Sequence, residues 1–283
     1  MSEPQQDRVR SRRGPVIGVF DSGFGGLTVL RALLPLIPGA HYIYLGDTAR
    51  LPYGEKSQAT IARYAVSSGA FLLGLGIDLL VVACNTASAL ALDDLCAALP
   101  VPVLGVIGPG AEAAANATAH GTTGSDATVL VLATSATVQA AAYTRACGAL
   151  GLVAHEKACP LLVPLVEEGW IDHPVTAEVL RIYLAEALNE APNATTLLLG
   201  CTHYPLLKPA IERTLHGLGH PMHIVDSADA TAAAACRLVV PGHAGTTSTC
   251  EFYATDSIEK FKRLGSRFLG QPLPQVKLID LGG

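Results

Sequence analysis

The chain has 283 residues, of which half are hydrophobic and only 15% are charged. That is enough apolar material for one large core or two smaller ones, and the net charge of −5 argues against nucleic acid as a partner. The most apolar stretch, residues 69–92, contains Asp78 and the polar run Cys84-Asn85-Thr86. A membrane helix needs about 20 predominantly apolar residues, so we expect no membrane partner.

The seven cysteines are widely spaced, with no CxxC pair and no zinc-ribbon spacing. Residues 1–14 form a polar, arginine-rich leader without the apolar segment of a secretion signal, and we expect this tail to be disordered. Without an export signal, the cysteines are expected to be reduced thiols of a cytoplasmic protein. Most should pack as small core residues, and the question is which do not.

Short apolar, β-branched runs alternate with Ala/Leu-rich segments along the whole chain. Near-continuous apolar runs of this length are typical of parallel strands covered on both faces. The pattern therefore predicts an α/β fold, with helices such as 61–75 and 176–189 lying between strands. In chain order, the expected strands are 16–20, 42–46, 79–83, 103–106, 128–132, 153–156, 196–200 and 222–225.

The sequence contains a weak internal duplication. The strands at 16–20 and 128–132 each run into a polar loop, and those at 79–83 and 196–200 are each followed by a cysteine, Cys84 and Cys201. Ligands of parallel sheets bind beyond the carboxyl ends of the strands. We therefore predict two facing α/β domains that share one cleft. Residues 15–106 plus 227–283 form the first domain, and residues 107–226 form the second.

The first polar loop reads Asp21-Ser22-Gly23-Phe24-Gly25-Gly26 and leads from a strand into a helix. Such a loop can hold an anion at the helix N-terminus. Its glycines do not fit the G-x-G-x-x-G dinucleotide pattern, and there is no Walker lysine. The alternative is a tight glycine turn with Asp21 as helix cap, and both interpretations stay open.

The two cysteine motifs, Ala83-Cys84-Asn85-Thr86 and Gly200-Cys201-Thr202-His203, place a thiol directly after a buried strand. The positive end of a helix dipole there should lower the pKa of the thiol. The neighbouring amide and hydroxyl groups suit a bound carboxylate or ammonium, and His203 is placed to exchange a proton with Cys201. A lone buried cysteine is more often a core residue, but the paired arrangement favours catalysis.

Four segments, DSGFGGLTVL, GDTARLPYG, ACNTASA and GCTHYPLL, occur in this order. They resemble the signature segments of glutamate racemases, within the aspartate/glutamate racemase family. The resemblance spans about residues 15–265 and leaves out the leader and the Ala/Gly/Thr-rich insertion at 111–127. It implies two pseudo-symmetric domains with mainly parallel sheets flanked by helices, and an active site in the cleft between them.

The resemblance also implies an activity and residue roles. The activity is the interconversion of L- and D-glutamate without cofactor or metal, which supplies D-glutamate for peptidoglycan; a homodimer is compatible with it. Cys84 would act on D-glutamate with help from Asp21, and Cys201 on L-glutamate with help from His203. A glutamate of the second domain assists Cys201, and in VEEGW Glu168 matches best, with Glu167 a close rival. The implied substrate-binding residues are Asp21, Ser22, Pro52, Tyr53, Gly54, Asn85, Thr86, Thr134, Thr137, Thr202 and His203.

Racemisation removes a weakly acidic α-proton from one face of the substrate and returns a proton to the other, which two facing thiols can do. No lysine lies in the four motifs to hold pyridoxal, so fixed dipoles and exclusion of water must stabilise the carbanion. We expect domain closure to gate the reaction. Three alternatives remain: an aspartate racemase, a zinc enzyme using Cys84, Cys201 and His203, and a two-lobed amino-acid receptor.

Overall fold

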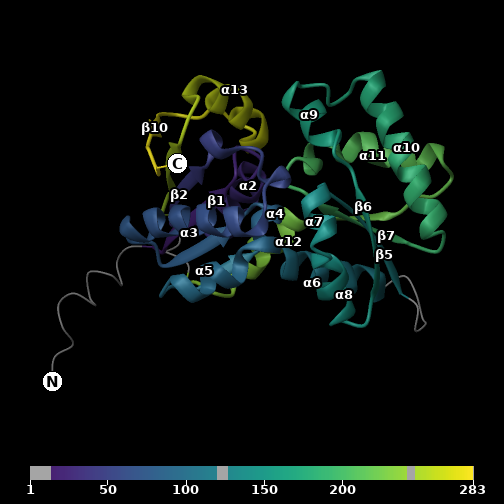
Figure 1. Ribbon diagram of the computed structural model, residues 1–283, viewed down its shortest axis with the longest axis horizontal. Helices are drawn as coiled ribbons and strands as arrows, with labels where there is room; N and C mark the ends of the chain where they lie inside the picture. Colours follow the sequence, from purple (N-terminus) through teal and green to yellow (C-terminus); the bar gives the residue numbers. More distant parts are fainter. Residues whose placement is uncertain (1–13, 120–126, 241–245, 283) are drawn as a thin grey trace.

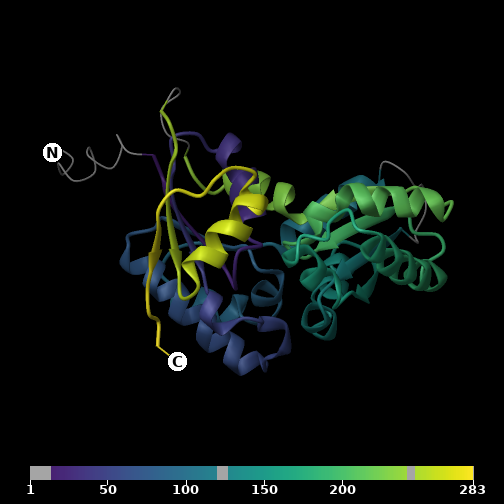
Figure 2. The same cartoon turned by 90° about the horizontal axis from the view of Figure 1, so that it is seen from above.

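The structure is a computed structural model that describes residues 14–119, 127–240 and 246–282. It has two lobes side by side, each a parallel sheet flanked by helices (Figures 1 and 2). Residues 1–13 of the predicted tail and 120–126 of the predicted insertion lie outside the described residues. Residues 107–119 form a helix. None of the helices in the described part of the chain has the length and apolar character needed to cross a membrane.

The strands in the described ranges are β1 (Val16–Asp21), β2 (His41–Gly46), β3 (Leu79–Val82), β4 (Val103–Gly105), β5 (Thr128–Ala133), β6 (Val153–Ala158), β7 (Thr196–Gly200), β8 (His223–Asp226), β9 (Thr249–Ala254) and β10 (Val276–Leu278). The helices there are α2 (Leu27–Leu36), η1 (Thr48–Arg50), η2 (Tyr53–Glu55), α3 (Gln58–Gly74), α4 (Asn85–Leu90), α5 (Leu92–Ala98), α6 (Ile107–Ala119), α7 (Ser135–Gln139), α8 (Ala142–Gly148), α9 (Leu162–Glu167), α10 (Pro174–Glu190), η3 (Tyr204–Leu207), α11 (Lys208–Gly217), α12 (Ser227–Cys236) and α13 (Ile258–Leu269).

The two sheets repeat one topology. The first lobe has the strand order β10-β9-β2-β1-β3-β4 and the second has β6-β5-β7-β8, with parallel pairing throughout the described strands. The block β2-β1-β3-β4 has the same order as β6-β5-β7-β8, so β1 corresponds to β5 and β3 to β7. This confirms the duplication expected from the sequence.

All eight expected strands are present, with ends within two residues of the prediction. Two further strands in the described residues, β9 and β10, were not predicted. The first half of β9 is exposed or half-buried and contains Glu251, which interrupts its apolar run. Edge strand β10 has three residues, two of them exposed. Neither strand has the continuous apolar pattern of a strand buried on both faces.

The buried strands fix where the polar loops begin. All four side chains of β3 are at most 1% exposed, and burying each contributes on the order of 2 kcal/mol. Strand β1 pairs with β3 in parallel register. The carboxyl ends of β1 and β3 therefore lie at the same sheet edge, where Asp21 and Cys84 stand. In the second lobe, β5 and β7 also pair in parallel, and their carboxyl ends bring Thr134 and Cys201 to one sheet edge.

Candidate active site

The first thiol lies at the junction of β3 and α4. Cys84 is the N-cap residue of α4, and its Sγ accepts a hydrogen bond from the backbone N–H of Ala87 at 3.4 Å. The thiol also donates to Ser22 Oγ at 3.4 Å. Asp21, the last residue of β1, is 2% exposed, and its Oδ2 accepts from the Gly23 N–H at 2.9 Å. The structure thus brings together the three predicted residues Asp21, Ser22 and Cys84.

The pKa values of the thiols are set by burial. Burial and the nearby charge of Asp21 raise the pKa of Cys84 to about 11, although the hydrogen bonds with Ser22 and Ala87 act in the opposite direction. Burial, and then the charges of Cys84 and Asp21, likewise raise the pKa of Cys201. Both pKa values are therefore raised, whereas the sequence predicted lowered ones, because each thiol is only 5 or 6% exposed and burial is the largest cause of its shift.

Asp21 shows the same effect. Its burial raises its pKa, while the Gly23 N–H and the charge of His203 lower it only in part. The carboxylate is therefore a stronger base than an ordinary aspartate. Its interpretation as a helix cap does not hold, since the N-cap residue of α2 is Gly26, with no side-chain capping bond.

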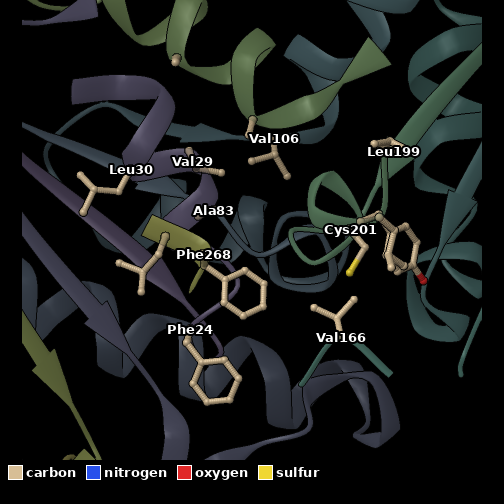
Figure 3. Close-up of a cluster of buried hydrophobic side chains, with 14 of the residues drawn as sticks. Phe24, Val29, Leu30, Ala83, Val106, Val166, Leu199, Cys201 and Phe268 are labelled. Atoms are coloured by element: carbon tan, nitrogen blue, oxygen red, sulfur yellow. The ribbon is translucent and has the colours of Figure 1, made fainter. Parts of the chain in front are cut away.

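The second thiol belongs to the loop after β7. Cys201 Sγ lies 4.0 Å from Nδ1 of His203, and the hydroxyl of Thr202 lies 3.4 Å from the same nitrogen. Cys201 stands among apolar side chains of both lobes, with Val166 and Leu199 from its own lobe and Phe24 and Phe268 from the other (Figure 3). These neighbours exclude water from the sulfur.

The carboxylate that contacts His203 belongs to Glu167. Its Oε1 lies 3.3 Å from His203 Nε2, and its Oε2 lies 3.6 Å from the Lys260 ammonium. Helix α9 ends at Glu167, and Glu168 follows as its C-cap residue, so the two side chains leave the helix about 100° apart. The structure thus places the rival, Glu167, in the position for which the sequence favoured Glu168. Nothing in the run VEEGW reveals that register.

The remaining polar residues meet across the lobes. The hydroxyl of Thr86 lies 3.1 Å from that of Thr134 and 3.4 Å from that of Thr137, and the last two are 3.0 Å apart. Asn85 Nδ2 donates to the hydroxyl of Tyr143 at 2.8 Å. The buried Oδ1 of Asn85 has no hydrogen-bond partner among the described residues. Sequence reasoning missed Tyr143, which lies within α8 and outside the four motifs.

The loop with Pro52, Tyr53 and Gly54 lies beside the second lobe. The Tyr53 hydroxyl donates to Oδ2 of the fully buried Asp47 at 2.5 Å, so this side chain anchors the loop to its own lobe. Gly54 lines a hollow of about 510 Å³ whose far side is formed by α7. At this hollow the loop approaches the second lobe.

The glycine loop touches the loop of the second thiol. A Cβ at Gly25 would lie 2.6 Å from the His203 ring, and nearer still to the Thr202 hydroxyl. The Thr28 hydroxyl donates to the carbonyls of both Gly25 (3.0 Å) and Thr202 (3.1 Å). A side chain at Gly25 would therefore separate the two halves of the site.

The chain resembles known proteins along most of its length. The family model for Asp/Glu/Hydantoin racemase matches residues 17–235. This chain belongs to that family. It is 47% identical to a glutamate racemase of Koribacter versatilis over 299 residues, which cover 96% of this chain and all of the relative.

Solved racemase structures have the same fold. The glutamate racemase of Thermus thermophilus, in complex with β-chloro-D-alanine, is 42% identical with a TM-score of 0.80. That of Francisella tularensis, in complex with D-glutamate, is 31% identical with a TM-score of 0.82. In both comparisons the match covers 96% of this chain and 98% of the other.

Chemically, the site of this racemase family member offers two free, buried thiols, one on each lobe. Each buried thiol has its own partners, Asp21 and Ser22 for Cys84, and His203 for Cys201. The charge of Cys84 acts on the pKa of Cys201, so the thiols are within electrostatic range of each other. Such a pair can donate and accept protons from two sides of a small molecule between them.

Proposed function

We propose that this chain is a glutamate racemase, an isomerase that moves the α-proton of glutamate between Cys84 and Cys201 without a cofactor. The observation that carries the proposal is the placement of the two thiols. Each follows the corresponding strand of one lobe, β3 or β7. The names of the relatives, and the D-glutamate bound to one of the solved structures, support glutamate as the substrate.

Starting from D-glutamate, the Cys84 thiolate takes the α-proton, and the electron pair moves into the α-carboxylate. The Cys201 thiol then gives its proton to the opposite face, which leaves L-glutamate, a Cys84 thiol and a Cys201 thiolate. The reaction from L-glutamate runs in reverse. Asp21 is the base that accepts the proton of Cys84, since its raised pKa brings it closer to that of the thiol.

On the other side, His203 exchanges a proton with Cys201. Burial alone would raise the pKa of Glu167, but contacts with His203 and Lys260 outweigh it and hold that pKa below its ordinary value. Glu167 is therefore ionised at neutral pH and accepts a hydrogen bond from His203 Nε2. This bond fixes the ring with Nδ1 toward the thiol. We assign Glu167, in place of Glu168, as the assisting carboxylate.

The polar groups between the lobes are suited to a charged amino acid. The unpartnered Oδ1 of Asn85 is an acceptor for the substrate ammonium. The hydroxyls of Thr86, Thr134, Thr137, Thr202 and Ser22, with the backbone N–H groups of Tyr53 and Gly54, are donors for its carboxylates. Pro52, which has no N–H, is the N-cap residue of the turn that carries Tyr53 and Gly54. Because both thiols are nearly inaccessible, the lobes must open to admit substrate and close for the reaction.

The proposed enzyme would act in the cytoplasm and supply cell-wall synthesis. The D-glutamate formed serves peptidoglycan synthesis, as the family resemblance implies. All seven cysteines are free, and two of them must stay reduced to work, which suits the cytoplasm. A homodimer is compatible with the fold of the family.

The test uses the full chain, treated to remove pyridoxal phosphate and dialysed against a chelator. The optical activity of L-glutamate and of L-aspartate is followed by circular dichroism, with a Cys84→Ser/Cys201→Ser double variant as control. We expect glutamate to lose its signal completely with wild type and to keep it with the double variant. Faster racemisation of aspartate would make this an aspartate racemase. Silence with both substrates would refute the proposal.

A further inference from the structure

Helix α13 belongs to the first lobe but touches the partners of the second thiol. Lys260 Nζ lies 3.6 Å from Glu167 Oε2. The ring of Phe268 packs edge-on against that of His203, with 4.9 Å between centroids. Arg267 packs over the backbone at Gly169, where a Cβ would overlap its guanidinium. The helix is therefore part of the interface between the lobes at the Cys201 side (Figure 1).

We propose that Lys260 is a positioning residue for the Cys201 side of the site. From the first lobe its ammonium keeps the Glu167 carboxylate ionised and directed at His203. This inference rests on the proposed racemase function and adds a residue to it. Since Lys260 and Glu167 stand on different lobes, the acid–base chain Cys201–His203–Glu167 gains this ammonium only when the lobes are closed.

The groups around Glu167 show how the charge of Lys260 acts on its carboxylate. Among the residues that the structure describes, two charged or titratable groups face this carboxylate, His203 from the loop after β7 and Lys260 from α13. His203 in turn faces Cys201 and is within electrostatic range of Asp21. Without Lys260, burial of Glu167 is opposed by His203 alone, and the carboxylate then takes up a proton at a higher pH.

The exposure of Lys260 limits the size of the effect. Its side chain is 48% exposed, so solvent screens the interaction more than in a buried pair. The ammonium also lies 5.6 Å from the centre of the Phe24 ring. This is a weak cation–π contact with a neutral side chain. We expect loss of the cation to shift the titration of Glu167 upward by about half to one pH unit.

The test measures kcat/KM for glutamate racemisation as a function of pH in wild type, Lys260→Met and Lys260→Arg. We expect the acid limb of the profile to move up by about half to one pH unit in Lys260→Met and to return in Lys260→Arg. Lys262→Met is the matched control, because Lys262 stands on the same helix 3.9 Å from the exposed Glu259. Its acid limb should stay in place.

The outcomes separate the two proposals. If wild type is silent with glutamate, the racemase function itself fails. If wild type is active and the acid limb of Lys260→Met stays in place, or Lys262→Met moves it equally, the role of Lys260 is refuted. If Lys260→Met fails to fold, the pH profile of wild type at high salt tests the same interaction. About 1 M salt, where the Debye length is about 3 Å, should move the acid limb in the same direction, and an unmoved limb refutes the inference.

Discussion

The close approach of Gly25 to the second lobe predicts that Gly25→Ala inactivates the enzyme without unfolding it. An alanine Cβ would lie 2.6 Å from the His203 ring, whereas ordinary contacts begin at about 3.5 Å. The loop with Thr202 and His203 must therefore retreat by about 1 Å. His203 cannot simply rotate away, since Glu167 and Phe268 hold it. A displacement of about 1 Å at a reacting group costs about 100-fold in rate.

The backbone at Gly25 itself tolerates alanine, because it is not among the glycines with positive φ. By reducing the freedom of the unfolded chain, such a change stabilises by about 0.4–1 kcal/mol where space allows. Gly148→Ala is the control, because a Cβ there meets nothing within 4 Å. We expect kcat to fall about 100-fold in Gly25→Ala and to stay unchanged in Gly148→Ala, with both variants folded by circular dichroism. Activity of Gly25→Ala within threefold of wild type would refute this account of the interface.

Three further predictions follow from the site. Glu167→Gln should lower kcat about 10–100-fold because it removes the charged partner of His203, while Glu168→Gln should change it little; equal effects in steady-state assays would contradict the assignment. Asn85→Ala should lower kcat/KM about 10–100-fold, as expected for a lost hydrogen bond to a charged group, and an unchanged value would remove Asn85 from the substrate site. Asp21→Asn should abolish activity yet raise Tm at pH 7. The pKa of Asp21 in the folded protein lies above its ordinary value of 3.8. Ionisation therefore penalises the folded state as pH rises through the folded pKa, and the gain in Tm should vanish below about pH 4.

The fold was largely predictable because its central strands are buried on both faces. Runs such as Leu79–Val82 carry an unbroken apolar signal, and the repeated order of strand, polar loop and cysteine revealed the duplication. Strands β9 and β10 lie toward one edge of the sheet, and their pairing is decided by neighbours distant in sequence. Their own residues carry little of that information.

The residues of the candidate site that belong to sequence motifs could be predicted. Those that reach the site through packing of the folded chain could not. The motifs around Cys84 and Cys201 named the residues that the parallel sheets bring together. They could not give the direction of the thiol pKa shifts, because burial is a property of the folded lobes. The choice of Glu167 over Glu168 depends on where α9 ends, and Tyr143 and Lys260 reach the site only through tertiary structure.

Proton transfer by two thiols on opposite faces of the substrate can be tested by racemising L-glutamate in D2O and stopping the reaction early. The α-hydrogen of each enantiomer is then analysed by mass spectrometry after chiral separation. Transfer between two thiols predicts that nearly all the D-glutamate formed carries deuterium, while the remaining L-glutamate keeps its protium. Deuterium appearing equally in both enantiomers, or D-glutamate formed without deuterium, would contradict it.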